Sequence, residues 1–190
     1  IFFFFLLVPS PAHALNRIGV KQGEFYDTVT GNTILLRGNN YQRIINTGTV
    51  ANPIFFHSNF IPNQYDHARY SSALSQMRQF GYNAVRVFIN EDALSTQSTT
   101  GLSVEYLKNM VKFINLAKDN NIYVLIQISV NPHNSNYLPP ITDPNMGPNG
   151  TYNAMLLNKD TVLAKKRYVS EFIAGLKSQG APMDAILGYS

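Results

Sequence analysis

The sequence predicts an α/β fold, namely the first four strands and connecting helices of a (β/α)8 TIM barrel, preceded by an N-terminal β-hairpin. Apolar runs typical of buried strands alternate with amphipathic helical stretches, and this order implies parallel strands joined by right-handed crossovers. Long polar loops follow Tyr41, Ile89 and Val130, which favours a barrel because all of its strands contribute to one mouth. A dinucleotide-binding sheet is not favoured, since the loop after the first strand lacks the later glycines.

The N-terminus has the features of a secretory signal peptide. An apolar run over residues 1–8 precedes Ala12-His13-Ala14, a small-x-small cleavage site, and the run is too short to cross a bilayer as a helix. We therefore expect residues 1–14 to be a partial signal peptide that lacks its basic beginning. Residues 15–190 are expected to be secreted, extracellular and without a membrane partner. The alternative is a hydrophobic first strand.

Composition excludes several classes of function. The chain has no cysteine, which excludes disulfides and thiolate chemistry and leaves stability to a sizeable core. Its net charge is +4, but the basic residues are scattered, and the single run Lys165-Lys166-Arg167 is typical of a solvated helix face rather than a nucleic-acid site. The four histidines lack metal-binding spacing, so we expect no metal and no other cofactor.

The segment after the signal begins with a predicted hairpin over residues 23–36, with Thr30-Gly31-Asn32 as its turn. Its second arm continues into the first long strand and its exit, residues 35–41. Residues 42–64 are rich in Asn, Pro and Gly and show no period, so we expect a long loop there. Loops of that length in compact domains are usually functional.

Three helices are predicted from apolar residues at helical spacing. The three sets are Tyr70, Ala73, Leu74, Met77 and Phe80; Leu107, Met110, Val111, Ile114 and Ala117; and Val162, Val169, Phe172, Ile173 and Leu176. Ser103 is expected to cap the second helix and Asn120-Asn121 to end it, while Gly180 is expected to end the third.

Further buried strands are predicted over residues 84–89, 122–130 and 185–189. An eight-stranded barrel needs roughly 250 residues, so four strands make half a barrel and we expect the sequence to be truncated at its C-terminus. The edges of the first and fourth strands would then invite aggregation or pairing of two half-barrels. Within the second strand, Arg86 interrupts the apolar run and predicts acidic or other hydrogen-bonding partners nearby.

Five stretches of the chain carry a family resemblance. They are Phe25-x-Asp27 with Thr30-Gly31; Leu36-Arg37-Gly38-Asn39-Asn40-Tyr41; Met77-x-x-x-Gly81-Tyr82-Asn83-Ala84-Val85-Arg86-Val87; Ala117 with Asn121-Ile122-Tyr123-Val124; and Asp184-Ala185-Ile186-Leu187-Gly188-Tyr189. Over about residues 20 to 190, this pattern resembles the N-terminal half of a cellulase-type glycoside hydrolase. It is most similar to glycoside hydrolase family 5 and the clan of retaining barrel enzymes around it.

The resemblance implies hydrolysis of a β-linked polysaccharide or glycoside with retention. That reaction needs two carboxyl groups about 5 Å apart. In the clan, the acid/base glutamate follows an asparagine at the end of the fourth strand and the nucleophile ends the seventh, so both are expected beyond Ser190. Arg86 matches the arginine whose implied catalytic role is to orient the nucleophile and keep it ionised. The alternative for Arg86 is a structural bridge to Glu91 or Asp92.

Substrate-binding candidates are Asn39, Asn40 and Tyr41 at the expected mouth, with His133 and Tyr137 after the third strand. Many relatives end that strand with an acidic residue followed two positions later by histidine, whereas this chain has Gln127-Ile128-Ser129. His133 is therefore a candidate for the vacant place. The chain has no tryptophan, so sugar stacking would fall to tyrosine or phenylalanine.

Two adjacent carboxylates, Glu91 and Asp92, cannot be the catalytic pair in a regular strand, where neighbours point to opposite faces. The sequence thus favours a secreted retaining glycosidase that acts on a polysaccharide or oligosaccharide and is a monomer when full length. A non-catalytic carbohydrate-binding barrel is the alternative. An aldolase-like barrel ranks last, because no lysine lies at a predicted strand end.

Overall fold

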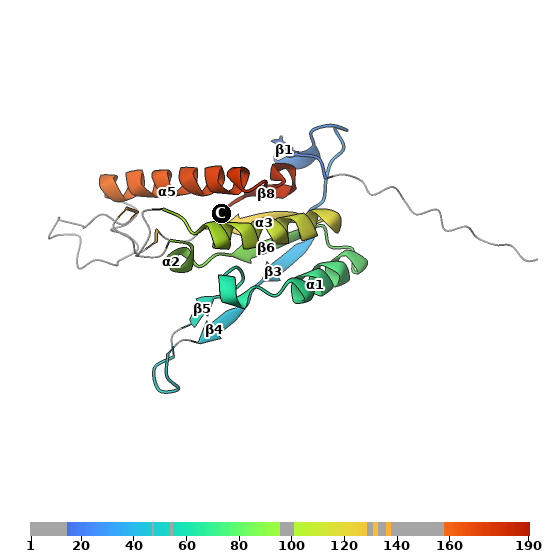
Figure 1. The fold of residues 1–190 in the computed structure, drawn as a ribbon. Helices are drawn as coiled ribbons and strands as arrows, with labels where there is room; N and C mark the ends of the chain where they lie inside the picture. The colour runs from blue at the N-terminus through green and yellow to red at the C-terminus, as the bar shows by residue number, and fades with distance from the viewer. Residues whose placement is uncertain are drawn as a thin grey trace, which may run out of the picture.

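A four-stranded parallel sheet, in the order β3, β6, β7, β8, forms the centre of the structure, a computed structural model (Figure 1). The strands span Gly38–Tyr41, Ala84–Phe88, Tyr123–Gln127 and Ile186–Tyr189. The structure describes residues 15–46, 48–53, 55–95, 101–128, 131–132, 136–137 and 158–190. The predicted signal peptide, residues 1–14, lies outside these residues. The predicted order of parallel strands is confirmed.

The long helices connect consecutive strands and lie alongside the sheet (Figure 1). They are α1 (His67–Gln79), α3 (Val104–Asp119) and α5 (Lys159–Ser178), and α3 contacts both of the others. Ser103 caps α3 as predicted, since its side chain accepts from the Tyr106 amide at 3.3 Å. Gly180 follows the end of α5 with a φ of 79°, which favours glycine.

The strands divide their side chains between two faces, because successive residues of a strand point to opposite sides. One side of the sheet packs against the helices, and we call it the helix face. Its side chains in the buried core include Val85, Val87, Val124 and Ile126. We call inner face the opposite side, whose positions follow from the strand register: Asn40, Ala84, Arg86, Phe88, Leu125 and Gln127. In a closed barrel this second face surrounds the axis.

The helical stripes are confirmed with two exceptions. All five predicted residues of α3 are buried, as are Tyr70, Leu74 and Met77 of α1. Phe80, in contrast, is 73% exposed because it follows the last turn of α1, and Val162 is 48% exposed. In α5, Ala164 and Tyr168 are buried together with the predicted Phe172 and Leu176, and the predicted Val169 and Ile173 are partly buried against the core.

The N-terminal hairpin has its turn at residues 22–23, before the turn predicted at residues 30–32. Its strands are β1 (Ile18–Lys21) and β2 (Glu24–Asp27), and they pair antiparallel around a turn at Gln22 and Gly23. The turn predicted at residues 30–32 also forms, but it closes a single bridge between Tyr26 and Thr33. The Asp27 carboxylate holds that turn by accepting from the amides of Val29 at 2.8 Å and Thr30 at 2.9 Å.

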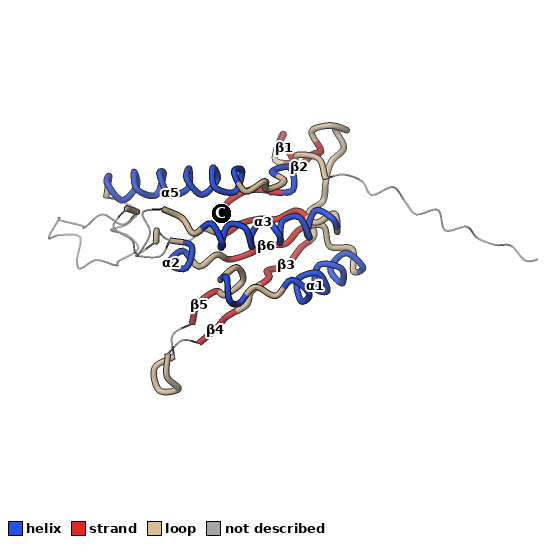
Figure 2. The backbone as a smooth tube through the Cα atoms, viewed as in Figure 1, coloured by secondary structure: helices blue, strands red, loops and turns tan. Residues whose placement is uncertain are grey.

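The segment predicted as a long loop contains a second hairpin. Strands β4 (Ile44–Asn46) and β5 (Phe55–His57) pair antiparallel, and a 3-10 turn, η1 (Pro62–Gln64), leads into α1. The short helix α2 (Glu91–Leu94) lies past β6, and a second 3-10 turn, η3 (Met183–Ala185), leads into β8. The β4–β5 hairpin and α2 lie at the end of the sheet opposite to β1 and β2 (Figure 2).

Candidate functional site

The carboxyl ends of the four parallel strands meet at one end of the sheet, which we call the mouth. Arg86 lies on the inner face two residues before the end of β6. In the strand register it stands between Asn40 of β3 and Leu125 of β7. Phe88 and Gln127 follow on the same face, at the very ends of β6 and β7. Residues at the carboxyl ends of barrel strands are where catalytic groups are expected.

The guanidinium of Arg86 reaches across β7 to the end of β8. Its Nη2 donates to Ser190 Oγ at 3.4 Å, and its Cζ lies 5.2 Å from the centre of the Phe88 ring. Its Nε is buried without a hydrogen-bond partner in the part of the chain that the structure describes. Since a guanidinium carries five N–H donors, Arg86 keeps donors for an acceptor held at the mouth.

An imidazole completes this group of side chains from the β4–β5 hairpin. The His57 ring stacks on Phe88, with the ring centres 5.0 Å apart and the planes at 24°. Burial lowers the pKa of His57, because it disfavours the charged imidazolium. Arg86, Phe88 and His57 therefore form one continuous stack of a cation and two rings, with the buried Phe88 in the middle. We call it the arginine cluster.

Asn59 ties the strand ends together behind this cluster. It is 1% exposed, and its Nδ2 donates to the carbonyl oxygens of Tyr41 at 3.3 Å and Phe88 at 3.2 Å. The Tyr70 hydroxyl of α1 donates in turn to the Asn59 carbonyl. The carboxyl ends of β3 and β6 are thus fixed to each other and to the first helix.

The three consecutive candidates of the first strand lie on different faces. Asn40 faces inward beside Arg86, whereas Asn39 and Tyr41 alternate to the other side of β3. The Tyr41 ring packs against Tyr70 at 5.5 Å, and burial raises the pKa of its hydroxyl. Asn39 and Asn40 both line a pocket with Arg86, and the register places Asn40 directly beside the arginine.

Tyr137 is fully buried under α5. Its hydroxyl donates to Glu171 and its ring lies 5.4 Å from that of Tyr168, so it packs the loop against the helix. Burial is the first cause of its raised pKa, followed by the bond with Glu171. His133, the other candidate after the third strand, lies outside the described residues.

Glu91 and Asp92 form the first turn of α2 rather than a continuation of β6, so the sequence-based argument from strand alternation does not apply to them. Glu91 is buried and Asp92 is exposed. The partners that the structure gives Arg86 are the Ser190 hydroxyl and the Phe88 ring.

A lysine reaches a strand end from a helix, which the sequence did not predict. Lys165 of α5 donates its Nζ to the carbonyl of Ile128, one residue past β7, at 3.3 Å. Burial lowers the pKa of this amine, and the negative charge of Glu91 partly opposes that shift. The amine lies over the Tyr168 ring at 5.5 Å, so it belongs to the helix face and not to the arginine cluster.

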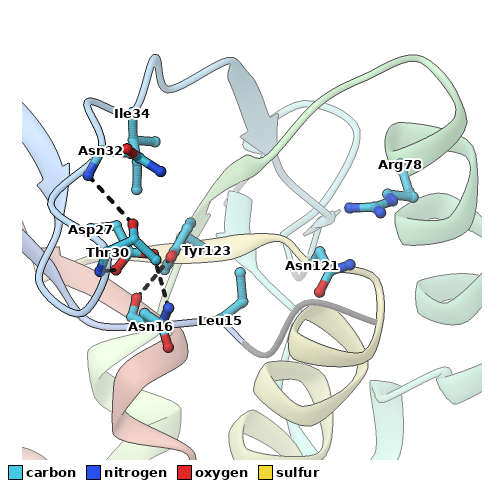
Figure 3. Close-up of a pocket in the computed structure, with 9 residues that line it drawn as sticks. All are labelled: Leu15, Asn16, Asp27, Thr30, Asn32, Ile34, Arg78, Asn121 and Tyr123. Atoms are coloured by element: carbon cyan, nitrogen blue, oxygen red, sulfur yellow. Dashed lines mark hydrogen bonds between the residues drawn. The ribbon is translucent and has the colours of Figure 1, made fainter. Parts of the chain in front are cut away.

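A pocket opens at the end of the sheet opposite to the mouth (Figure 3). Asp27 lies in it and accepts from Asn16 Nδ2 at 2.9 Å, while the Tyr123 hydroxyl donates to the Asn16 carbonyl at 2.8 Å. Hydrogen bonds, that from the Thr30 amide first, hold the pKa of Asp27 below its usual range. Because Tyr123 begins β7, this pocket lies at the amino ends of the strands, where barrels place stability rather than chemistry.

Sequence reasoning missed His57 and Asn59 as parts of the mouth. Both lie in the segment predicted as an irregular loop, and their partners are distant in sequence: Phe88 for the imidazole, Tyr41 and Phe88 for the amide. The run Phe55-Phe56-His57 was the available signal, since β-branched and aromatic runs favour strands.

No helix of the described residues is both long enough and apolar enough to span a membrane. No cluster of three or more histidine, aspartate or glutamate side chains in the same residues is arranged to hold a metal ion.

Parallel strands with connecting helices packed along one face are the arrangement of (β/α)8 barrels, and the described residues contain four such strands. A family model described as cellulase (glycosyl hydrolase family 5) matches residues 32–177. The chain therefore belongs to glycosyl hydrolase family 5. The family predicted from the sequence is confirmed.

Two solved structures share the fold. A β-mannanase from the blue mussel Mytilus edulis is 18% identical, with a TM-score of 0.57 over 93% of this chain and 45% of that one. An endo-1,4-β-mannanase from Rhizomucor miehei is 14% identical, with a TM-score of 0.57 over 92% of this chain and 47% of that one. The chain spans about half the length of these mannanases. No curated protein sequence matches it.

Proposed function

We propose that this chain forms the first half of the catalytic barrel of a retaining glycoside hydrolase that cleaves a β-linked polysaccharide. The observation that carries the proposal is the position of Arg86 on the inner face, with its guanidinium directed at the carboxyl end of the fourth parallel strand. The acid/base glutamate implied by the family follows that strand end. The second carboxyl group that retention requires, the nucleophile, is implied by the family at the end of the seventh strand of the barrel.

Arg86 would act on the nucleophile as a positioning residue. A guanidinium within hydrogen-bond distance stabilises a carboxylate in its ionised form and fixes its orientation. Phe88 covers one side of the guanidinium, and its Nη2 donates to Ser190 at the end of β8. Asn40, its neighbour in the register, offers an amide to a sugar hydroxyl on the same face.

Family membership and the chemistry of the mouth support a neutral polysaccharide as the substrate. Amide, guanidinium and aromatic groups suit hydroxyl-rich, uncharged rings, and the two similar structures are both mannanases by name. β-1,4-Mannan and β-1,4-glucan are therefore the substrates to assay first. We also propose that the protein is secreted, since residues 1–14 have the pattern of a signal peptide and external polysaccharides are degraded outside the cell.

The test uses the full-length protein that carries this chain, with release of reducing ends from both polysaccharides as the measurement. Arg86→Ala is expected to lower kcat by about 10²- to 10³-fold, as loss of one preorganised donor does elsewhere, while Arg86→Lys restores part of it. The matched control is Arg78→Ala at the opposite end of the sheet, which should leave activity unchanged. Circular dichroism of each variant checks the fold.

The outcomes separate the two functions considered. Hydrolysis that depends on Arg86 supports the glycosidase. Oligosaccharide binding without any hydrolysis in the full-length protein would overturn it in favour of a non-catalytic carbohydrate-binding barrel. Full activity in Arg86→Ala would show that the arginine does not serve the reaction.

A further inference from the structure

We infer that one face of the β4–β5 hairpin is a carbohydrate-binding subsite at the rim of the barrel, with Phe55 as the ring on which a sugar stacks. The inference rests on the proposed function, because it takes the same polysaccharide as its ligand. It adds a subsite remote from the cleaved bond.

The two faces of this hairpin differ in what they join. In the antiparallel register Ile44 pairs with His57, and Phe55 lies two residues before His57, so these three side chains share one face. Ile45 and Phe56 pair on the other face. Phe55 is 64% exposed and Ile44 is 54% exposed, so the first face offers apolar surface to solvent.

His57 connects that face to the arginine cluster. Its ring stacks on Phe88 at 5.0 Å, and Phe88 lies 5.2 Å from the Arg86 guanidinium carbon. Phe55 lies two residues before His57 in β5, which corresponds to about 6.6 Å along the strand. A run of flat groups therefore leads outward from Arg86 to the rim, past the carboxyl end of β6. Phe56, on the opposite face, has no such connection recorded among the described residues.

A polysaccharide fits this surface better than a second copy of the chain does. Burying one phenylalanine covers about 150–250 Å², whereas a stable protein interface needs about 800 Å² from each partner. Ile44 and Phe55 are partly covered already and fall well short of that area. A neutral sugar needs one flat apolar ring beside polar groups. Phe55 is such a ring, exposed on the hairpin face that leads through His57 to the arginine cluster.

The decisive comparison is between neighbouring phenylalanines of one strand. Phe55→Ala and Phe56→Ala are made in the full-length protein, and calorimetry measures the Kd of β-1,4-linked mannose and glucose oligosaccharides of two and six units. Phe55→Ala is expected to weaken binding of the hexasaccharide by about five- to tenfold, the loss of one stacking contact. Binding of the disaccharide should not change. Phe56→Ala should leave both affinities at the wild-type value.

Each result decides a different statement. Equal hexasaccharide affinity in wild type and Phe55→Ala overturns the subsite even if the enzyme is active. A change of oligomeric state in Phe55→Ala, measured by light scattering, also overturns it and makes the face a protein interface. Wild-type binding that depends on Phe55 but comes without hydrolysis supports the subsite and overturns only the proposed catalysis. Failure of every variant and of wild type to bind oligosaccharide overturns both.

Discussion

The helix face and the inner face of the same sheet differ in almost every physical respect. On the helix face, Tyr70, Phe60 and Phe113 interlock edge to face with ring centres 5.3 to 5.6 Å apart, and all are at most 1% exposed. On the inner face, Arg86 and Phe88 stand beside a partly exposed imidazole. One side of each strand therefore stabilises the fold, while the other presents chemistry.

This division explains how a strand of five residues can carry both tasks. Val85 and Val87 belong to the buried core, and Arg86 between them points the opposite way. A substitution on one face should therefore leave the other task largely intact, because strand neighbours share a backbone but not a side-chain environment. The following predictions test that separation.

The largest expected effect is on the helix face. Phe113→Ala should lower the free energy of unfolding by about 3–5 kcal/mol, since it removes a fully buried ring from the aromatic cluster and leaves a cavity. Arg86→Ala, on the inner face, should lower it by about 1 kcal/mol or less. Urea denaturation followed by circular dichroism measures both. Equal losses for the two variants would break the distinction between the faces.

Two glycines of the sheet give a second matched pair. A Cβ at Gly38 would lie 2.2 Å from the carbonyl oxygen of Ala84, a backbone atom of the neighbouring strand. Gly38→Ala should therefore push β3 away from β6 and cost about 1–3 kcal/mol. Gly188→Ala in β8 meets only Leu125 Cδ1 at 3.8 Å, an ordinary contact, and should be close to neutral. A tolerated Gly38→Ala, by the same denaturation assay, would mean that β3 is not held tightly against β6.

Two buried tyrosines of the helix face differ in whether their hydroxyl group has a hydrogen-bond partner. The Tyr106 hydroxyl accepts from the Asn90 amide at 2.8 Å, so Tyr106→Phe leaves a buried donor unsatisfied and should cost about 1–2 kcal/mol. The Tyr168 hydroxyl is buried without a hydrogen-bond partner in the described part of the chain. Tyr168→Phe should therefore be neutral or slightly stabilising. Thermal unfolding of the two variants side by side tests this, and the reverse order would contradict it.

The sequence predicted the features that depend on local periodicity. Leu107, Met110, Val111, Ile114 and Ala117 recur at helical intervals, and all five are buried in α3. The order of the parallel strands followed from the alternation of strand and helix patterns along the chain. Phe80 failed because spacing alone does not show where a helix ends: α1 stops at Gln79, so the next residue in phase turns to solvent.

The parts that could not be predicted depend on contacts between distant residues. His57 finds Phe88 and Asn59 finds both Tyr41 and Phe88, through a hairpin whose strands have only three residues each. Three residues are too few to show a period. The sequence predicted that Asn39, Asn40 and Tyr41 leave the first strand at the mouth. They form β3 itself, so their side chains alternate between its two faces.

The smallest expected effect is a shift in the pKa of His57, whose ring stacks on Phe88 of the inner face. Burial lowers the pKa of His57, so nuclear magnetic resonance titration of its ring should give a midpoint below the usual value of about 6.5. As pH falls from about 6.5 through the lowered pKa, the unfolded chain takes up this proton and the folded chain does not, so stability declines in that range. Phe88→Ala removes the ring that covers the imidazole and should raise the midpoint toward 6.5. A midpoint at or above 6.5 in the wild-type protein would show that the imidazole is solvated, and that the hairpin does not pack against Phe88 at the rim.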